Sequence, residues 1–374
     1  MSARRDDDQG DRFERILVVC TRQLGDVLLT TPLIHAARQR WPAAVIDVLG
    51  FGGTLGMLRG NPDIGELIEV PAGSGWVASR RLFGRLWRRY DLALVAQYSD
   101  RAHLYGFAAA RRRSGQVTRE AKSWWKRALL AHEVPMDETQ SHAVVQKLRL
   151  LEPWGLPAGA ALVAPPAAGL PAAIAARLAP PYAVLQTPTA VAYKQWPIAH
   201  WRTLVAALLE RGLQVVLTGA PSEADRAVVT AVKADHDEGD GRLVDAAGAL
   251  DLGQVGTLLR GCAVYIGGDT SITHLAAACD VAVVALYGPI NPRYFGPWPP
   301  NPTLDVPYVA HALVQHVGNT TVLQGSPPCV PCDRAGCLDR NDSASVCLMT
   351  LAPERVVAEV DRVLEGARAA TMAR

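Results

Sequence analysis

One aspartate of this 374-residue chain lies where a ligand is commonly bound. Asp26 follows Gly25, where the apolar run Ile16 to Cys20 gives way to a helical pattern of apolar residues. In open parallel sheets, ligands bind where the carboxyl end of a strand meets the amino end of a helix. Asp is also a favoured helix N-cap in any fold. Asp26 is therefore either a functional carboxylate or a capping residue.

A denser motif, AVYIGGDTSITHLAAACDVAVVALYGP, occurs in the second half of the chain. A strand is expected to end in Gly267 and Gly268, and a helix to begin at Thr270 or Ser271. The free backbone N–H groups and the dipole of such a helix start favour an anion, and phosphate is the natural ligand. The adjacent glycines let the backbone approach an oxyanion closely.

Two further side chains of this motif have alternative interpretations. Asp269 repels phosphate, so it is either the helix N-cap or a partner for sugar hydroxyls. His274 lies one helical turn further on, where it could reach the same ligand. A single histidine on an alanine-rich helix is otherwise a satisfied core residue.

Four of the seven cysteines lie within nineteen residues, in the spacing C-x2-C-x4-C-x9-C: Cys329, Cys332, Cys337 and Cys347. A C-x2-C turn presents two sulfurs to one ion, and a nearby pair completes a tetrahedron, so the spacing predicts a structural zinc or iron site. Three alternatives remain: the thiols are simply buried, they form disulfides after purification, or they are a family relic that binds no metal ion.

A strongly basic stretch extends from Arg80 to Arg127. It contains thirteen Lys or Arg and three Asp or Glu, a local net charge of +10 in a chain whose total is +2. Trp87, Tyr90, Trp124 and Trp125 are interleaved with these charges. The stretch is either a solvated helix face or a surface for an anionic partner such as phosphorylated lipid, a membrane or nucleic acid, and the aromatic residues favour the second interpretation.

The elements that must position these residues follow an α/β pattern. The stretch from Arg15 to Gly50 predicts strand, turn, helix and strand, with the helix starting at Asp26, and the same alternation resumes at Tyr182. The chain is also longer than one hydrophobic core usually serves. We predict two doubly wound domains facing across a cleft, in this division: a flexible N-terminus over 1–14, an N-terminal domain over 15–152, a Pro/Ala-rich linker over 153–181, a C-terminal domain over 182–350, and a C-terminal helix over 351–374.

Three motifs, QLGDVLLTTP, YKQWP and GGDTSITHLAAA followed by LYGPINP, together resemble glycosyltransferase family 9, the bacterial heptosyltransferases. The resemblance covers the chain from about Arg15 to Ala358. It implies a GT-B fold of two Rossmann-like domains, with an acceptor-side first domain and a donor-binding second domain.

The resemblance also implies roles for individual residues. The family's general base aligns with Asp26, and its donor-phosphate lysine aligns with Lys194. The residues that bind the sugar and diphosphate align with Asp269, Thr270 and His274. Further donor contacts are implied at Thr189, Glu223, Gly268 and Ser271, where Ser271 replaces a glycine that is common in the family.

The implied activity is an inverting, metal-independent transfer, with ADP-heptose as donor and a lipopolysaccharide core or related envelope acceptor. No catalytic metal is expected. The chain has D-x-D motifs at Asp6-Asp7-Asp8, near the N-terminus, and at Asp235-His236-Asp237. Alternatives are a heptosyltransferase of autotransporter adhesins, a nucleotide-sugar epimerase of GT-B fold, or a non-catalytic nucleotide-sugar binder. The autotransporter branch carries a four-cysteine iron site, although its cysteine order differs.

The expected partners and location follow from the same resemblance. The basic stretch 80–127 would contact the membrane surface or an anionic lipid-linked acceptor, and nucleic acid is not expected as a partner. The first fourteen residues contain no apolar signal segment. We therefore expect a cytoplasmic protein, peripheral on the inner face of the cytoplasmic membrane.

Overall fold

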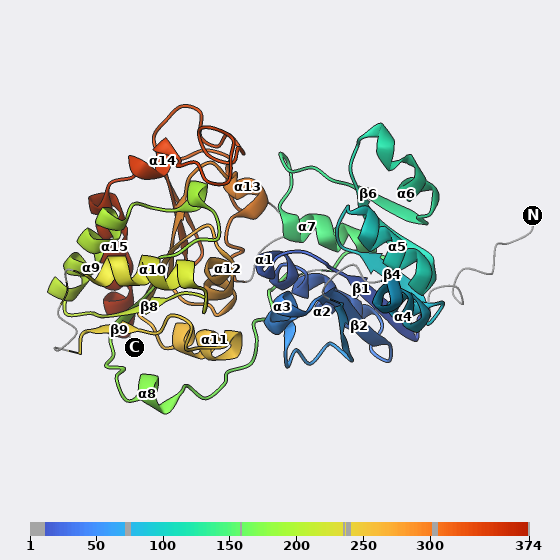
Figure 1. Cartoon of the computed structure of the whole chain (residues 1–374), viewed down its shortest axis with the longest axis horizontal. Coiled ribbons are helices and arrows are strands. Elements are labelled where there is room, and N and C mark those ends of the chain that lie inside the picture. The colour runs from blue at the N-terminus through green and yellow to red at the C-terminus, as the bar shows by residue number, and fades with distance from the viewer. Residues whose placement is uncertain are drawn as a thin grey trace, which may run out of the picture. The chain divides into compact units, whose positions relative to one another are not determined.

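The structure, a computed structural model, describes residues 12–71, 76–157, 159–234, 236, 241–300 and 306–372. These residues form two compact units, of which unit 1 runs to Val163 and unit 2 begins at Ala164 (Figure 1). The boundary between the two units lies inside the proline-rich range 153–181. The flexible segment expected over 1–14 lies, up to residue 11, outside the described residues, whereas Phe13 is buried.

Unit 1 contains a six-stranded parallel sheet in the order β3-β2-β1-β4-β5-β6. The strands are short runs of apolar residues, as expected for strands that are covered on both faces. The elements are β1 (Arg15–Val19), α1 (Leu24–Leu28), α2 (Thr31–Arg40), β2 (Val45–Phe51), α3 (Gly52–Leu55), β3 (Leu67–Val70), α4 (Trp76–Leu86), β4 (Tyr90–Val95), α5 (Asp100–Ala109), β5 (Ala110–Val117), α6 (Trp124–Ala128), β6 (His132–Pro135) and α7 (Ala143–Leu148), with the 3₁₀ helices Gly56–Leu58, Ala121–Ser123 and Arg149–Trp154.

The helix expected from Asp26 onward is two helices in the structure. α1 begins at Leu24, before Gly25, and α2 begins at Thr31. Pro32 lies in the first turn of α2, where its missing N–H leaves no internal bond unmade. The break places Asp26 in the first turn of α1, with Gln23 as the N-cap, so the capping interpretation of Asp26 is wrong.

Unit 2 contains a seven-stranded sheet in the order β12-β13-β11-β10-β7-β8-β9, in which only β12 is antiparallel. The elements are α8 (Ala172–Ala175), β7 (Tyr182–Gln186), α9 (Ile198–Glu210), β8 (Gln214–Thr218), α10 (Glu223–Lys233), β9 (Leu243–Asp245), α11 (Leu252–Arg260), β10 (Val264–Gly268), α12 (Ser271–Ala278), β11 (Val283–Tyr287), α13 (Pro292–Phe295), β12 (Val314–Val317), β13 (Thr320–Gln324), α14 (Val346–Met349) and α15 (Pro353–Met372), with the 3₁₀ turn Ala192–Lys194.

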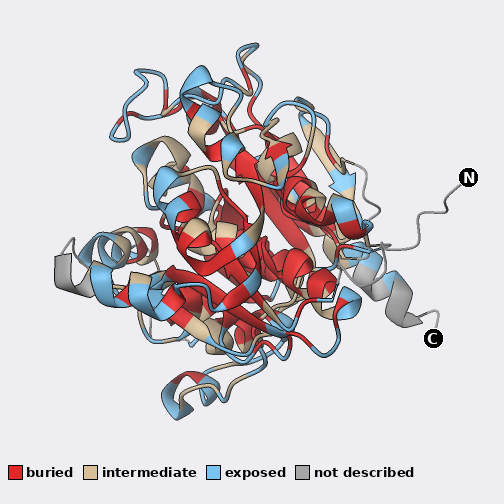
Figure 2. Cartoon of the chain, turned by 90° about the vertical axis from the view of Figure 1, so that its right-hand side faces the viewer, coloured by how far each residue is buried: buried red, intermediate tan, exposed pale blue. Residues whose placement is uncertain are grey.

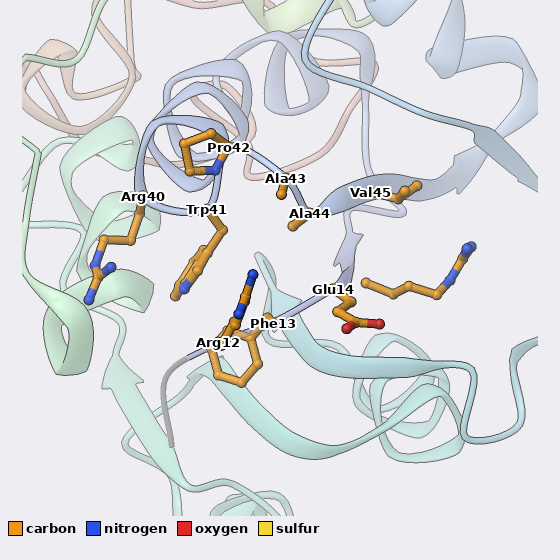
Figure 3. A pocket seen from close by; sticks show the side chains of 10 residues that line it. Arg12, Phe13, Glu14, Arg40, Trp41, Pro42, Ala43, Ala44 and Val45 are labelled. Atoms are coloured by element: carbon orange, nitrogen blue, oxygen red, sulfur yellow. The ribbon is translucent and has the colours of Figure 1, made fainter. Parts of the chain in front are cut away.

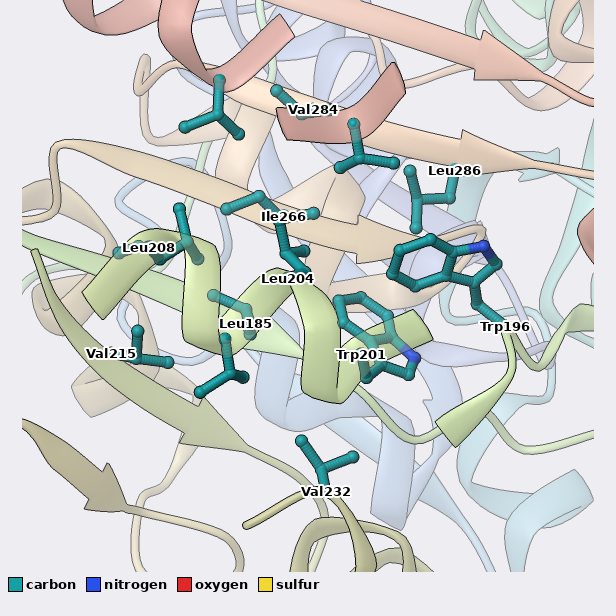
Figure 4. Packing of buried hydrophobic residues seen from close by; sticks show 14 of the residues in the cluster. Leu185, Trp196, Trp201, Leu204, Leu208, Val215, Val232, Ile266, Val284 and Leu286 are labelled. Carbon is teal, nitrogen blue, oxygen red and sulfur yellow. The ribbon is translucent and has the colours of Figure 1, made fainter. Parts of the chain in front are cut away.

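The largest core cluster of unit 2 fills one face of this sheet. Alternate residues of β7, β8, β10 and β11 pack against α9, α10 and α15 (Figure 4). Trp196 and Trp201 are fully buried and lie edge to face, with ring centroids 4.9 Å apart. Buried residues follow the strands, and exposed residues occur on the outer parts of the helices (Figure 2). This packing fixes the strand ends on which the candidate site of unit 2 depends.

Leu204→Ala tests this core. Leu204 is fully buried in α9 within the cluster, so its truncation removes apolar contacts and leaves a cavity. We expect the free energy of unfolding of unit 2 to fall by about 2–5 kcal/mol, measured by urea denaturation. Leu313→Ala, at a half-exposed leucine of the same unit, should change it by less than about 0.5 kcal/mol. Similar losses of stability in both variants would contradict the placement of Leu204 in the core of unit 2.

Each sheet has a topological switch point, where the strands on one side follow the chain in one direction across the sheet and the strands on the other side follow it in the opposite direction. In unit 1 the point lies between β1 and β4, and in unit 2 between β7 and β10. Loops that leave neighbouring strands to opposite sides open a crevice at the carboxyl ends of those strands, where ligands bind in doubly wound folds. Asp26 follows β1, and Asp269 follows β10 directly. The expected class, two doubly wound α/β units, is confirmed.

Candidate functional site

Asp26 is held in unit 1 by contacts to both its side chain and its backbone. Its carboxylate Oδ2 lies 3.2 Å from Nε of Arg22, and its side chain is 12% exposed. Its carbonyl oxygen accepts hydrogen bonds from Thr30 Oγ1 at 2.7 Å and Lys147 Nζ at 2.9 Å. The carboxylate is thus fixed in orientation and remains open to solvent on one side.

The sequence analysis did not identify Arg22 or Lys147. Arg22 precedes Asp26 by four residues, a spacing that signals an ion pair on a helical turn. Lys147 is 121 residues away on α7, and its buried side chain carries no local signal. Burial raises the pKa of the neighbouring Cys20 thiol, so this thiol keeps its proton at neutral pH.

The adjacent strand contributes a polar network at the same point of the sheet. Gln97, just after β4, accepts the backbone N–H of Thr21 at 2.6 Å and donates to Thr21 Oγ1 at 2.9 Å. Its amide also donates to Ser99, the N-cap of α5. The loop between β1 and α1 is therefore hydrogen-bonded to the segment after β4. These bonds fix the position of the loop that precedes Asp26.

In unit 2 the glycine-rich turn has the expected form. β10 ends at Gly268, Thr270 is the N-cap of α12, and its hydroxyl accepts the N–H of Thr273. Ser271 is the first helical residue, so its N–H lies at the positive end of the helix. Asp269 precedes the N-cap, and its interpretation as the cap is wrong.

Lys194 and Asp269 form the closest charged pair of this edge. Lys194 Nζ lies 2.6 Å from Asp269 Oδ2, with side chains 24% and 9% exposed. A Cβ placed on Gly268 would lie 3.4 Å from the Lys194 carbonyl oxygen and 3.6 Å from Cγ2 of Thr189. The structure therefore brings together four predicted residues from two strand ends: Thr189, Lys194, Gly268 and Asp269.

The remaining predicted donor residues lie on helices that follow β10 and β8. His274 is buried in the second turn of α12. Glu223 is the exposed first residue of α10, which follows the neighbouring strand β8. Burial, together with the carboxylate of Asp269, raises the pKa of Tyr287, so its hydroxyl keeps its proton and donates to the Phe295 carbonyl oxygen at 2.7 Å.

The four cysteines do not form the predicted metal site. The part of the chain that the structure describes contains no group of three or more His, Cys, Asp or Glu side chains placed to hold an ion. Cys329, Cys332 and Cys337 are exposed, whereas Cys347 is buried in α14, and burial raises the pKa of its thiol to about 11. A structural zinc or iron at these residues is therefore not supported.

The basic stretch 80–127 does not form one surface. Because β4 and β5 are parallel, Arg88, Arg89 and Arg111 to Arg113 lie at the amino ends of the strands. Arg119 and Lys122 follow β5, at the carboxyl ends, on the edge that carries Asp26. Trp124, the first residue of α6, is 69% exposed. Lys126 is buried and donates to the Tyr98 carbonyl oxygen at 2.8 Å, so it is part of the framework.

Figure 3 shows a pocket of about 770 Å³ in unit 1. It lies at the amino ends of β1 and β2, whereas Asp26 follows the carboxyl end of β1. It is lined by residues before and at the start of β1 and β2, among them Arg12, Arg15, Trp41 and Val45. Trp41 packs edge to face on Phe13, with ring centroids 5.0 Å apart. Since ligands of doubly wound sheets bind at the carboxyl ends of strands, this pocket is not the candidate active site.

Comparison with known proteins identifies the family. The profile of glycosyltransferase family 9 (heptosyltransferase) matches residues 79–306. Lipopolysaccharide heptosyltransferase 3 of Escherichia coli is 27% identical over 293 residues, which cover 74% of this chain and 84% of that protein.

Two solved structures show the same fold. E. coli ADP-heptose lipopolysaccharide heptosyltransferase II has a TM-score of 0.71 at 22% identity, covering 95% of this chain and 99% of that one. E. coli heptosyltransferase WaaC with ADP-2-deoxy-2-fluoro heptose has a TM-score of 0.66 at 20% identity, covering 93% and 99%.

The two units have the GT-B fold of these structures. The chain belongs to glycosyltransferase family 9, the heptosyltransferases. This confirms the resemblance and the enzyme class predicted from the three motifs.

Proposed function

We propose that the protein transfers heptose from ADP-heptose to a lipopolysaccharide core acceptor, with inversion at the anomeric carbon and without a catalytic metal. The observation that carries the proposal is the Lys194–Asp269 pair beside the free start of α12, at the point where the strand order of unit 2 reverses. Family relatives named as lipopolysaccharide heptosyltransferases, and a solved relative that holds an ADP-heptose analogue, support this donor and acceptor.

Asp26 is the proposed general base. Its carboxylate accepts the proton of the acceptor hydroxyl while the acceptor oxygen forms a bond to the anomeric carbon. The bond from that carbon to the diphosphate breaks, and ADP leaves with the electron pair. Attack from the face opposite the leaving group inverts the configuration. The contact with Arg22 supports the role, because it holds the carboxylate in one orientation.

The donor diphosphate is proposed to bind the group at β7 and β10. Lys194 supplies a cation, and the start of α12 at Thr270 and Ser271 supplies backbone N–H groups and the positive end of the helix dipole. These groups stabilise the negative charge that develops on the departing diphosphate. In other glycosyltransferases a divalent metal stabilises this charge. Lys194 and the start of α12 would replace the metal, which supports the metal-independent reaction.

The other donor residues have narrower proposed roles. Asp269 would exchange part of its contact with Lys194 for sugar hydroxyls when the donor binds, and His274 would reach the same ligand from the next turn. Thr189 is proposed as a phosphate contact and Glu223 as a ribose contact. Family membership favours this transfer over the epimerase and the non-catalytic binder, and an adhesin serine remains the alternative acceptor.

A donor screen tests the proposal directly. Thermal shift with ADP-, UDP- and GDP-sugars should give stabilisation by ADP-heptose that exceeds the others, since a ligand stabilises the state that it binds. Glucose and mannose nucleotides serve as matched controls for the base and the sugar. Equal shifts with all three bases would contradict an ADP-sugar donor.

We propose that the loop after β5 contacts an anionic lipid-linked acceptor at the inner face of the cytoplasmic membrane. Arg119 and Lys122 are exposed between β5 and α6, and Trp124 is exposed at the start of α6, at the edge of unit 1 that carries Asp26. Cations beside an exposed aromatic ring favour an interface with anionic lipid. None of the described helices has the length and apolar character that a membrane span requires.

Arg119→Glu with Lys122→Glu should weaken binding to vesicles that contain anionic lipid by at least about tenfold, because each basic residue near the surface contributes roughly 1 kcal/mol. Flotation measured from about 50 to 300 mM salt should show the same loss in the unaltered protein. Donor binding should change little in both experiments.

Arg81→Glu with Arg89→Glu is the matched control. It makes the same change of charge at exposed residues of the basic stretch that lie on α4 and just before β4. Vesicle binding should stay within about twofold of the unaltered protein. Equal losses in the two double variants would show that net charge alone governs binding.

A further inference from the structure

The segment that carries three of the exposed cysteines, residues 326–345, forms a closed loop between β13 and α14. The N–H of Arg340 donates to the Ala335 carbonyl oxygen at 2.6 Å, and the N–H of Ser343 donates to that of Arg340 at 2.9 Å. The Ser343 hydroxyl also lies 3.2 Å from the Ala335 carbonyl oxygen and accepts the N–H of Leu338. The loop therefore holds its own shape without regular secondary structure.

This loop is bonded to the 3₁₀ turn Ala192–Lys194. The N–H of Ala192 donates to the Asn341 carbonyl oxygen at 3.0 Å. The hydroxyl of Ser345, which is 2% exposed, donates to the Tyr193 carbonyl oxygen at 2.7 Å. A Cβ placed on Gly336 would lie 3.0 Å from the Cβ of Tyr193, so the two backbones are in close contact. Three points of the loop thus define the place of the turn.

The other side of the loop is hydrogen-bonded to the segment between β11 and α13. The N–H of Asp333 donates to the Pro289 carbonyl oxygen at 2.8 Å, and its carboxylate accepts the N–H of Asn291 at 2.9 Å. Asn291 is the N-cap of α13. The loop therefore connects the turn of Lys194 to a second loop at the carboxyl edge of the same sheet.

The turn itself has few bonds of its own. Its backbone bonds are from the N–H of Lys194 to the Val191 carbonyl oxygen at 3.2 Å and from the N–H of Gln195 to that of Ala192 at 3.0 Å. The Tyr193 carbonyl belongs to the peptide plane that leads into Lys194, so its direction sets where the lysine side chain starts. A lysine side chain is flexible, and its placement therefore depends on a fixed backbone.

We propose that Ser345 is a positioning residue for Lys194, acting through the carbonyl group of Tyr193. The proposal rests on the donor role of Lys194 given above. The hydrogen bond from Ser345 fixes the orientation of the peptide plane between Tyr193 and Lys194. Nζ of Lys194 is thereby placed to bind the donor diphosphate before the donor arrives. Nothing about the cysteines themselves is needed for this role.

Ser345→Ala tests the proposal, with Ser343→Ala as the matched control. Both variants remove one buried hydroxyl from the same loop, but the hydrogen bonds of Ser343 lie within the loop. We expect Ser345→Ala to raise the dissociation constant of the nucleotide-sugar donor at least about fivefold, because small misplacements of a binding group are costly. Ser343→Ala should stay within about twofold, with a similar fall in melting temperature in both variants. Ser345→Thr, which keeps the hydroxyl, should bind donor nearly as the unaltered protein does.

The double variant with Lys194→Ala separates this role from a general structural one. If Ser345 acts through Lys194, its substitution should add less than about twofold to the loss already caused by Lys194→Ala. An equal further loss would overturn the positioning role, as would a Ser345→Ala variant that binds donor like Ser343→Ala. If Lys194→Ala binds donor normally, the donor role of Lys194 fails and the positioning role fails with it.

Discussion

Asp26→Asn should lower the rate of heptose transfer by about 10³-fold, within the range of roughly 10² to 10⁴ expected for loss of a general base. The amide has nearly the shape of the carboxylate but cannot accept the proton of the acceptor hydroxyl. The backbone contacts of residue 26, from Thr30 and Lys147, do not depend on its side chain. Donor affinity should therefore stay within a few-fold, measured by titration with ADP-heptose.

Asp100→Asn is the control for this result. Asp100 is the first residue of α5 in the same unit and pairs with Lys126 at 2.9 Å, so its substitution also removes one paired carboxylate near the carboxyl ends of the strands. Its transfer rate should change by less than about threefold, because the Asp100 carboxylate is exposed and Lys126 keeps its hydrogen bond to the Tyr98 carbonyl oxygen. A fully active Asp26→Asn variant would leave Asp26 with a structural role only.

Lys194→Ala should lower kcat/KM for the nucleotide-sugar donor by about 10²-fold, because a positioned cation stabilises the charge on the departing diphosphate. The loss should appear in kcat as well as in donor affinity, since the charge grows in the transition state. The measurement is a steady-state series in donor concentration with saturating acceptor.

Stability must be measured alongside, because Lys194 is also the partner of Asp269, which is 9% exposed. Lys233→Ala is the control, since Lys233 pairs with Asp245 at 2.9 Å elsewhere in unit 2. Lys194→Ala should lose more melting temperature than Lys233→Ala, because Asp269 is more buried than Asp245, but only Lys194→Ala should lose activity. A Lys194→Ala variant that unfolds readily while its native fraction keeps normal kinetics would contradict the donor role.

The strands could be predicted from the sequence because each is a short apolar run covered on both faces. The alternation expected to resume at Tyr182 begins there in the structure, with β7. The helix after Pro197 is α9, for which proline at the start is favourable. The break at Thr30 was missed because the apolar residues keep helical spacing across it, and only Pro32 marks it.

The candidate site was predictable only where function depends on local sequence. The turn Gly268 to Ser271 has a strand, glycines and a helix start within a few residues, and the structure has that form. Contacts between distant segments, such as Lys147 with the Asp26 carbonyl, carry no local pattern. The spacing of four cysteines likewise says nothing about burial, and one of them, Cys347, is enclosed by the fold while the others are exposed.

The most direct test of the central claim is the release of ADP from ADP-heptose by the purified protein, with and without a heptose-deficient lipopolysaccharide acceptor. We predict release that depends on the acceptor, is unchanged by EDTA, and is matched by an equal amount of heptose bound to the acceptor in inverted configuration. Release that needs no acceptor, stops with EDTA, or leaves the acceptor unmodified would contradict the assignment.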